Sequence, residues 1–191
     1  MRDRRPADEL ILVDASNRVV GHEDKERCHD GAGIRHRALS VFLFNSRGDV
    51  LLQRRAAKKR LWPGFWSNSC CSHPRRGESV TTAARRRLEQ ELGVRTSAKL
   101  LFRFEYQAPF GSIGSEHELC AVLVAHSDAP VRANPDEVAS WCFVSPTEID
   151  RRLRRSPHTH TPWMHLEWQR LRGPTWTRVQ RYLNHCLHES P

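Results

Sequence analysis

Residues 67–79, Ser-Asn-Ser-Cys-Cys-Ser-His-Pro-Arg-Arg-Gly-Glu-Ser, bring together several side-chain types that carry out chemistry. Two adjacent thiols, Cys70 and Cys71, stand just before the imidazole of His73. A thiol can act as a nucleophile or transfer a proton, and an imidazole can bind a metal ion. Neighbouring cysteines are poor disulfide partners, so we expect at least one of the two to be a reactive thiol.

A charged helix is predicted directly after these residues, over residues 79–92. Its apolar side chains recur at helical spacing on one side: Ala83, Ala84, Leu88 and Leu92. Gly93 suits the left-handed position that ends a helix. The charged side chains, Glu91 among them, are expected around the remaining surface. Carboxylates on this helix could therefore serve a metal ion next to the thiols.

Strands and turns before this centre are predicted to hold it in place. Strands are indicated at residues 10–13, 18–21, 38–44 and 50–54. The first two form a hairpin, and the last two pair back through a turn. Residues 23–36 are polar, and a basic loop at residues 54–60 precedes an irregular stretch that contains proline and glycine.

The residues after the helix predict further strands and a helical end. Strands are expected at residues 99–107, 116–125 and 139–144. A loop is expected at residues 108–115. Ser145, followed by Pro146 and Glu148, has the pattern of a capped helix start. Strands enclosing a central helix, with helices at the end of the chain, predict an α/β (α+β) fold, a mixed-sheet sandwich with flanking helices.

The length and charge limit the classes of partner. A chain of 191 residues can form one domain with a core that needs no staples. The net charge of +9 comes almost entirely from arginine and favours a phosphate-bearing partner. A nucleic acid, a small diphosphate and a merely solvated arginine-rich surface all fit this charge.

We expect neither a signal peptide nor a membrane anchor. No apolar run follows the charged first residues, and no stretch approaches the ~18 apolar residues of a membrane helix. The sequence therefore predicts a cytoplasmic protein whose thiols stay reduced. Its six cysteines lack paired CxxC spacing, which argues against a structural zinc site.

The helix and the residues before it resemble the Nudix box. That box reads Gly, five residues, Glu, seven residues, Arg-Glu, an apolar residue, any residue, Glu-Glu, any residue and Gly. The matching residues here are Glu78, Arg86, Glu91 and Gly93. Three positions depart from the pattern: Ser72 replaces a glycine, and Arg87 and Gln90 replace glutamates. The missing carboxylates argue against a hydrolase that assembles several metals on this helix, and a solvated charged helix face is the alternative.

A wider set of motifs resembles type I isopentenyl-diphosphate isomerase, a Nudix-fold branch that does not hydrolyse its diphosphate. The motifs are Asn68 to Pro74, His29, His36, Arg54-Arg55, Trp62-Pro63-Gly64, Tyr106, Glu116-His117-Glu118 and Pro162-Trp163-Met164. They agree in order and spacing over residues 9–165. The resemblance implies one Nudix-type domain over residues 1–191, with catalytic motifs in about 25–165, a helical segment at 166–191 and disorder at 1–8.

This resemblance implies two metal sites. The first uses three imidazoles and two carboxylates: His29, His36, His73, Glu116 and Glu118. Such a set suits one Mn²⁺, Mg²⁺ or Zn²⁺ ion, although any of these histidines alone would be read as a surface residue. Residues two apart on a strand share a face, so Glu116 and Glu118 point together and His117 points away. The second site is a Mg²⁺ ion on the diphosphate, held by Glu91.

The substrate's diphosphate is expected at a cationic mouth. By resemblance, its contacts are Lys25, Arg55, Lys59 and Ser72. Arg87 is a further candidate because arginine matches phosphate geometry. The neighbouring Lys58 and Arg60 are expected to belong to a solvated loop.

The implied reaction moves a double bond from isopentenyl to dimethylallyl diphosphate through a tertiary cation. An acid and a base are needed on opposite faces, with water excluded. The resemblance assigns Cys71 to one face, its thiolate favoured by nearby cations. It assigns Glu118 and Tyr106 to the other. Trp163 would place its ring against the cation, with core packing as the alternative, and Cys70 is expected to face the core.

Two other functions fit part of the sequence. A Nudix pyrophosphohydrolase of nucleoside diphosphate derivatives would need more carboxylates in the box. A non-catalytic RNA-binding Nudix-like module would leave the histidine and glutamate set unexplained. We expect a small-molecule diphosphate as the partner, no nucleic acid, no membrane, and a monomer or weak dimer.

Overall fold

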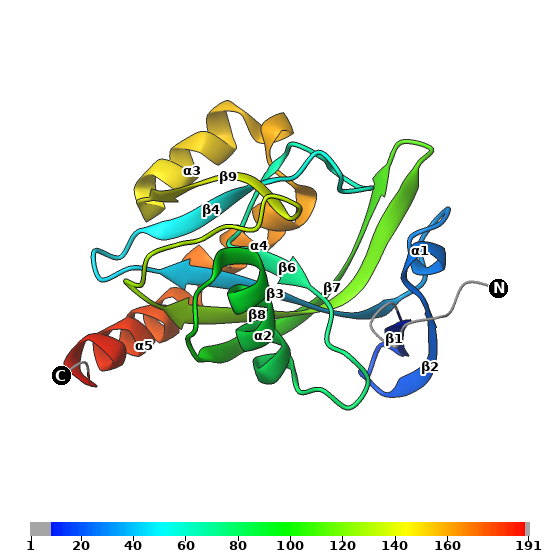
Figure 1. Cartoon of the computed structure of the whole chain (residues 1–191), viewed down its shortest axis with the longest axis horizontal. Coiled ribbons are helices and arrows are strands. Elements are labelled where there is room, and N and C mark those ends of the chain that lie inside the picture. Colours follow the sequence, from blue (N-terminus) through cyan, green and yellow to red (C-terminus); the bar gives the residue numbers. More distant parts are fainter. Residues whose placement is uncertain (1–8, 190–191) are drawn as a thin grey trace.

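The structure, a computed structural model, describes residues 9–189, so the disorder expected for residues 1–8 lies outside that range. Its centre is a mixed sheet (Figure 1). The middle strand, β3 (His36–Phe44), pairs in parallel with β8 (Gly114–His126) along its whole length. On its other edge β3 pairs antiparallel with β6 (Cys70–Ser72), the strand that carries both adjacent cysteines.

Shorter strands extend this centre. The hairpin of β1 (Glu9–Val13) and β2 (Val19–Asp24) joins one end of β3 and confirms the predicted hairpin. β4 (Val50–Arg55) meets β3 at its first residue and pairs along its length with β9 (Val138–Val144). β5 (Trp66–Ser67) pairs with the end of β4 and leads into the cysteines.

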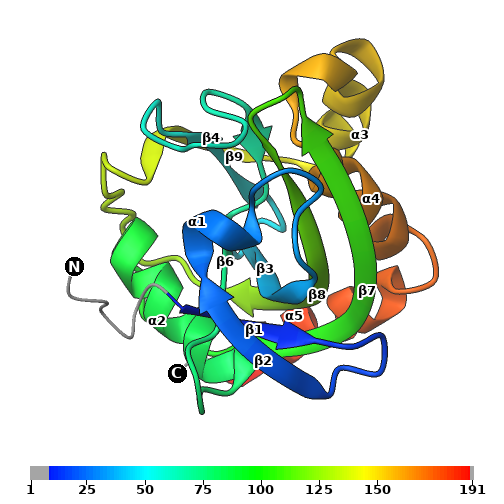
Figure 2. The ribbon, with the colours of Figure 1, turned by 90° about the vertical axis from the view of Figure 1, so that its right-hand side faces the viewer.

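β7 (Ala98–Phe110) and β8 form a long curved hairpin, seen in Figure 2. The prediction of a loop at residues 108–115 was wrong, because both strands continue to a tight turn at residues 111–113. This extension reaches the residues after α1 (Lys25–Cys28), where the Ser115 amide donates a hydrogen bond to the His29 carbonyl.

Helices cover both faces of the sheet (Figure 1). α2 (Val80–Leu92) packs on one face, and α4 (Pro162–Arg172) and α5 (Trp176–Glu189) pack on the other. The alternation of β3 explains this division, since its successive side chains join different clusters. Toward α2 it presents Leu39, Val41 and Leu43. Toward α4 and α5 it presents Ala38, Phe42 and Phe44.

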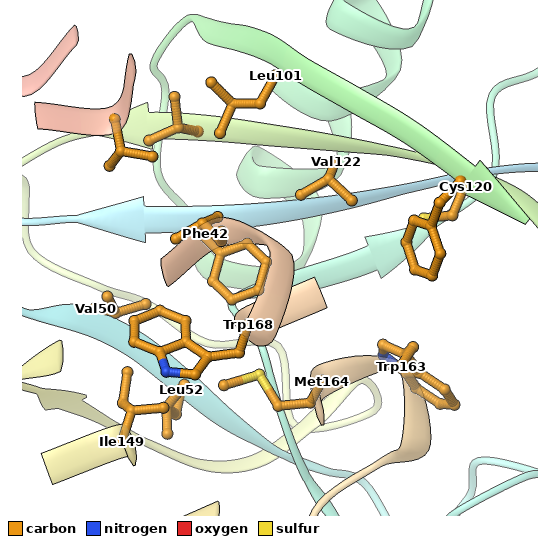
Figure 3. Close-up of a cluster of buried hydrophobic side chains, with 14 of the residues drawn as sticks. Phe42, Val50, Leu52, Leu101, Cys120, Val122, Ile149, Trp163, Met164 and Trp168 are labelled. Atoms are coloured by element: carbon orange, nitrogen blue, oxygen red, sulfur yellow. The ribbon is translucent and has the colours of Figure 1, made fainter. Parts of the chain in front are cut away.

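The cluster between the sheet and helices α4 and α5 is visible in Figure 3. There Trp163, Met164 and Trp168 of α4 lie beside Phe42 and Cys120 of the sheet. This packing fixes α4 against the strands that carry the candidate chemistry.

The helix ends follow the predicted local signals. The Ser79 hydroxyl accepts a hydrogen bond from the Thr82 amide at the start of α2, and Gly93 ends that helix with φ 69°. Ser145 caps α3 (Pro146–Arg155) by accepting from the Glu148 amide. Among residues 9–189, no helix combines the length and apolarity needed to cross a bilayer.

Candidate active site

Most of the predicted site residues line one cavity of about 210 Å³. They come from distant parts of the sequence: Lys25, His29, Arg55, Lys59, Cys71, Ser72, His73, Arg87, Tyr106, Glu116, Glu118 and Trp163. His36 is fully buried behind the cavity wall, with its ring centroid 5.0 Å from that of His29 and 4.9 Å from that of His73. Glu91, like His36, is not among the residues that line this cavity.

Three imidazoles and two carboxylates converge on one side of the cavity. Glu116 Oε2 lies 2.8 Å from His29 Nε2. Glu118 Oε1 lies 3.4 Å from His73 Nε2 and 3.8 Å from His36 Nε2. The register of β3 and β8 explains part of this convergence, since it sets His36 directly opposite Glu118. His117 faces the other way and contacts Glu105, as the strand alternation predicted.

The hydrogen bonds of the rings show that this group suits a cation. His29 Nδ1 lies 2.6 Å from the Lys25 carbonyl and His36 Nδ1 lies 2.7 Å from the Ile34 carbonyl, so each Nδ1–H donates to the backbone. Their Nε2 lone pairs therefore point inward, as metal ligands require. Inside, His36 Nε2 lies 3.1 Å from His73 Nε2.

The electrostatics of these three imidazoles and two carboxylates also favour a bound cation. Glu116 Oε2 approaches His29 Nε2 yet has no properly oriented hydrogen bond within the described chain. Burial lowers the pKa of His29, but the adjoining Glu116 carboxylate outweighs burial and the pKa is raised overall, so a positive charge is favoured between these two side chains. Burial, and then the neighbouring His36, lower the pKa of His73 well below its ordinary value, which keeps that imidazole neutral and able to bind a metal. The donor set fits a divalent metal ion.

The Cys71 thiol lines the same cavity from β6, on the other edge of β3 from β8, and has a hydrogen-bond network of its own. Its sulfur donates to Asn68 Oδ1 at 2.8 Å, and the indole Nε1–H of Trp163 donates to the sulfur at 3.1 Å. The same indole contacts the Ser67 hydroxyl at 3.0 Å. Sequence reasoning assigned no role to Ser67 or Asn68, although both stand in residues 67–79 and Asn68 begins the run that carried the resemblance.

The protonation state of Cys71 corrects a prediction. Burial, and then the nearby carboxyl of Glu167, raise the pKa of Cys71 to about 12. The prediction that nearby cations favour its thiolate was wrong, because desolvation outweighs the attraction to Arg55. Cys71 is a neutral thiol in this structure. Cys70 is fully buried in the cluster beneath α2, as predicted.

Glu118 and Tyr106 form a hydrogen-bonded pair in the same cavity. The two residues are paired across β7 and β8, and the Tyr106 hydroxyl donates to Glu118 Oε2 at 2.8 Å. Burial raises the pKa of Tyr106 well above its ordinary value, so the phenol keeps its proton. Burial also raises the pKa of Glu118, but contacts with His36 and Tyr106 outweigh that effect, and its pKa is lowered overall.

Cations surround the mouth of the cavity. Backbone carbonyls hold Arg55: its Nε donates to Trp62 O at 3.1 Å and its Nη2 to Leu61 O at 2.8 Å. Its guanidinium lies 5.2 Å from the centre of the Trp163 ring. Lys59 and Arg87 both pair with Glu137, a carboxylate that the sequence analysis did not consider.

Arg60 and Lys25 also lie at the mouth of the cavity. Arg60 was predicted to be solvated, but its side chain bonds to Glu26 and to the Ile113 carbonyl, and so ties α1 to the tip of the β7–β8 hairpin. No local sequence pattern predicts this contact, because its partners lie far apart along the chain. Burial, followed by the charge of Lys59, lowers the pKa of Lys25.

Glu91 lies beneath the cavity wall. It is 1% exposed, and Arg87 binds it with Nη2 2.6 Å and Nε 3.1 Å from Oε1. The expectation that Glu91 stands on the solvated side of α2 was wrong. It follows Leu88 by three residues, so it shares the buried side of the helix. Arg87 stands between Glu91 and the cavity.

Comparisons with known proteins agree with this geometry. The NUDIX domain family matches residues 34–166. The chain is 40% identical over 161 residues to isopentenyl-diphosphate Delta-isomerase 1 of Photorhabdus laumondii, covering 83% of this chain and 92% of that protein. It is 43% identical over 157 residues to isopentenyl-diphosphate Delta-isomerase 2 of Aromatoleum aromaticum, covering 82% of each.

Solved structures show the same fold. A protein from Deinococcus radiodurans superposes with a TM-score of 0.68 at 24% identity, covering 85% of this chain and 98% of that one. The MutT protein of Methanosarcina mazei superposes with a TM-score of 0.58 at 17% identity, covering 78% and 94%. Together with the identities above, these matches show that the chain belongs to the NUDIX domain family and, within it, to the isopentenyl-diphosphate Delta-isomerases.

Proposed function

We propose that this chain interconverts isopentenyl and dimethylallyl diphosphate for isoprenoid biosynthesis. The relatives are named for this reaction, and one observation in the site supports it above the others. The Cys71 thiol and the Glu118–Tyr106 pair line one small cavity from different strands, so a substrate between them has a proton-transfer group on each side. An alkene that must gain one proton and lose another needs this arrangement.

The diphosphate end of the substrate binds the cations at the mouth. Lys25, Arg55, Lys59 and Arg87 supply positive charge, and the Ser72 hydroxyl supplies a hydrogen bond. Lys59 and Arg87 are held by Glu137 in this structure. The diphosphate replaces that carboxylate as their partner when substrate enters.

One divalent cation fits the residues present: Mn²⁺, Mg²⁺ or Zn²⁺ would be held by His29, His36, His73, Glu116 and Glu118. Service of a second cation, Mg²⁺ on the diphosphate, by Glu91 would require Arg87 to leave that carboxylate and turn to the phosphate. A bound cation supplies fixed positive charge beside Glu118 and so changes the proton affinity of that carboxylate.

The protein's own groups carry out the two proton transfers. The Tyr106–Glu118 pair protonates the terminal alkene carbon, which leaves a tertiary cation on the next carbon. The neutral Cys71 thiol must first lose its own proton. The thiolate then accepts the proton from the carbon next to the diphosphate-bearing one, and the electron pair of that C–H bond forms the new double bond. The buried ring of Trp163 lines the cavity, where its face stabilises the cation and its bulk excludes water.

The test is a direct assay. Purified protein is incubated with isopentenyl diphosphate and Mg²⁺, and the product is separated from the substrate by chromatography. We expect dimethylallyl diphosphate to accumulate to equilibrium without release of phosphate. Release of phosphate or diphosphate in place of the isomer would contradict the proposal.

A further inference from the structure

A second cavity, the α3 cavity, has a volume of about 320 Å³. It is lined by α3, by the residues that connect α3 to α4, and by Trp66 of β5. Among residues 9–189, no residue lines both the α3 cavity and the catalytic cavity. The volume is at the lower end of the ~300–1,000 Å³ that is usual for small-molecule sites.

Positive charge gathers on the helix side of the α3 cavity. Arg151 and Arg152 stand four and three residues before Arg155, so the three guanidinium groups share one side of α3. The Glu148 carboxylate contacts Arg151 at 2.6 Å and Arg152 at 3.0 Å and offsets one of the three charges. Arg155 has no ion-pair partner within the described part of the chain. The helix side of the cavity is therefore ready to bind an anion.

The residues after α3 contribute a buried imidazole with an unused nitrogen. His160 is 5% exposed, and its Nδ1 lies 3.0 Å from the Thr159 hydroxyl oxygen and 3.2 Å from the Ser156 carbonyl. The Thr159 hydroxyl donates its own proton to that carbonyl, so Nδ1 carries the proton of the ring. Nε2 has no hydrogen-bond partner among residues 9–189. A buried polar atom without a partner is costly, so a ligand that satisfies it is favoured.

The wall that carries His160 is fixed by backbone contacts. Trp66 and His160 form a parallel bridge, and the Thr161 amide donates to the Trp66 carbonyl at 2.9 Å. In the next pair of residues, the hydroxyls of Ser67 and Thr161 lie 3.0 Å apart. The α3 cavity is therefore already formed, and a ligand that enters it does not have to order this wall.

Basic residues in the last turn also stabilise the end of a helix, and this effect alone explains arginines on α3. It does not explain why the same arginines share a cavity with a buried, unpartnered imidazole and an indole ring from other segments. That combination points to a ligand.

The chemistry of the lining selects a phosphate group. Guanidinium N–H groups match the geometry of ionised phosphate oxygens. A phosphate group loses its second proton at a pKa of about 6, so it can also keep a P–OH that donates to an imidazole nitrogen. A nucleic-acid strand would need a longer groove that follows several phosphates, and a cavity of about 320 Å³ fits a small molecule better.

We propose that the α3 cavity is a second binding site, for a small phosphate-bearing molecule, separate from the mouth that takes the diphosphate of the substrate. Its arginines hold the phosphate oxygens, and the Trp66 ring offers a surface to the organic part of the ligand. The inference goes beyond the proposed function and does not depend on it, because its residues lie outside the catalytic cavity.

The test follows two indole N–H signals in ¹H–¹⁵N NMR spectra while the full chain is titrated with inorganic diphosphate. Trp66 lines the α3 cavity and Trp163 lines the catalytic cavity, so each indole reports one site. Trp66→Phe and Trp163→Phe assign the signals. Arg155→Gln removes a charge from the α3 cavity without breaking an ion pair among the described residues. Arg154→Gln is the matched control, because its exposed side chain does not line the cavity.

We expect the Trp66 signal to move with a midpoint different from that of Trp163. Arg155→Gln should weaken the Trp66 response by ~10-fold, the effect of losing one charge-assisted hydrogen bond, and leave the Trp163 response unchanged. Arg154→Gln should match the wild type at both signals. Neither variant should change kcat or KM for isomerisation in the absence of added diphosphate.

A Trp66 signal that does not move, or that follows the Trp163 midpoint in both variants, would overturn the inference. Equal weakening in Arg154→Gln and Arg155→Gln would also overturn it, since that result indicates general attraction to a basic surface. A single-stranded oligonucleotide that moves the Trp66 signal at lower phosphate concentration than diphosphate would show that the assignment to a small molecule is wrong. None of these outcomes decides the isomerase assay, which measures product from the other cavity.

Discussion

Cys70 and Cys71 differ in what surrounds them although they are neighbours. Cys70 is fully buried against the α2 side of the sheet, and Cys71 faces the substrate cavity on the opposite side. The indole of Trp163 and the carboxamide of Asn68 fix the position of the Cys71 sulfur. Because the sulfur is fixed, a substitution at one cysteine should not be compensated by the other.

We therefore expect Cys71→Ala to lower kcat by at least ~10²- to 10⁴-fold, the effect of removing a general acid–base group. Cys70→Ala is the matched control. It should keep its turnover and lose about 1 kcal/mol of stability, because it removes a small buried side chain. Isomerase rates and thermal melts of both variants make the comparison. Near-normal turnover of folded Cys71→Ala, or loss of activity in folded Cys70→Ala, would contradict the assignment.

At the scale of elements, the β7–β8 hairpin positions two of the candidate metal ligands and supports a third. It carries Glu116 and Glu118, and the first residues of β8 contact the chain around His29. Gly114 makes this contact possible, since a Cβ there would lie 2.1 Å from the His29 carbonyl oxygen. Gly111 stands at the turn of the same hairpin, where a Cβ would have nothing within 4 Å.

Gly114→Ala should move His29 and weaken metal binding by ~10–100-fold, as substitutions that displace a ligand's support do. Gly111→Ala should cost about 1–2 kcal/mol of backbone strain, because its φ is 56°, and should leave metal binding intact. Metal content after dialysis against a graded series of chelators measures the difference. Equal metal retention in the two variants would show that the close contact does not position His29.

The segment before β9 supplies a second element-scale test. Glu137 pairs with Lys59 and Arg87, and burial opposed by Lys59 leaves its pKa lowered to about 2. A depressed folded pKa stabilises the protein above the ordinary value of 4.5, and this contribution is lost as pH falls through about 2.

Glu137→Gln should therefore lower stability at neutral pH by about 1–2 kcal/mol, after allowance for solvent screening, and the difference should shrink in acid. Asp136→Asn is the matched control, because its pair with Lys58 is largely exposed and should contribute little. Thermal melts at several pH values test both. Equal losses in the two variants at neutral pH would contradict this account of Glu137.

The sequence predicted what depends on local pattern. Alternation placed Glu116 and Glu118 on one face and Cys70 and Cys71 on opposite faces, and capping residues located the end of α2 and the start of α3. Pairings between distant segments could not be predicted in this way. The pairing of β4 with β9 and the contact of Lys59 with Glu137 join residues far apart along the chain. The spacing from Leu88 puts Glu91 on the buried side of α2, but its contact with Arg87 beside the cavity depends on the packing of the whole fold.

For the whole molecule, the charge balance of α2 separates this chain from Nudix hydrolases. Arg86 pairs with Glu78 and Arg87 pairs with Glu91, so arginines neutralise two carboxylates of the Nudix box. We expect no useful hydrolysis of nucleoside diphosphate derivatives. Phosphate and nucleotide release from a panel of such compounds, compared with isomerisation under the same conditions, is the measurement. Release at a rate comparable to isomerisation would show that the expectation is wrong.

The central claim is that two protein groups, Cys71 on one side and Tyr106–Glu118 on the other, exchange protons with one substrate. The most direct measurement converts isopentenyl diphosphate with protein transferred into D₂O beforehand and locates deuterium in the product by mass spectrometry and NMR. The account predicts deuterium in the newly formed methyl group of dimethylallyl diphosphate, because that proton comes from the exchangeable Tyr106–Glu118 pair. Product formed without deuterium in that methyl group would mean that hydrogen moves within the substrate itself, and would contradict the account.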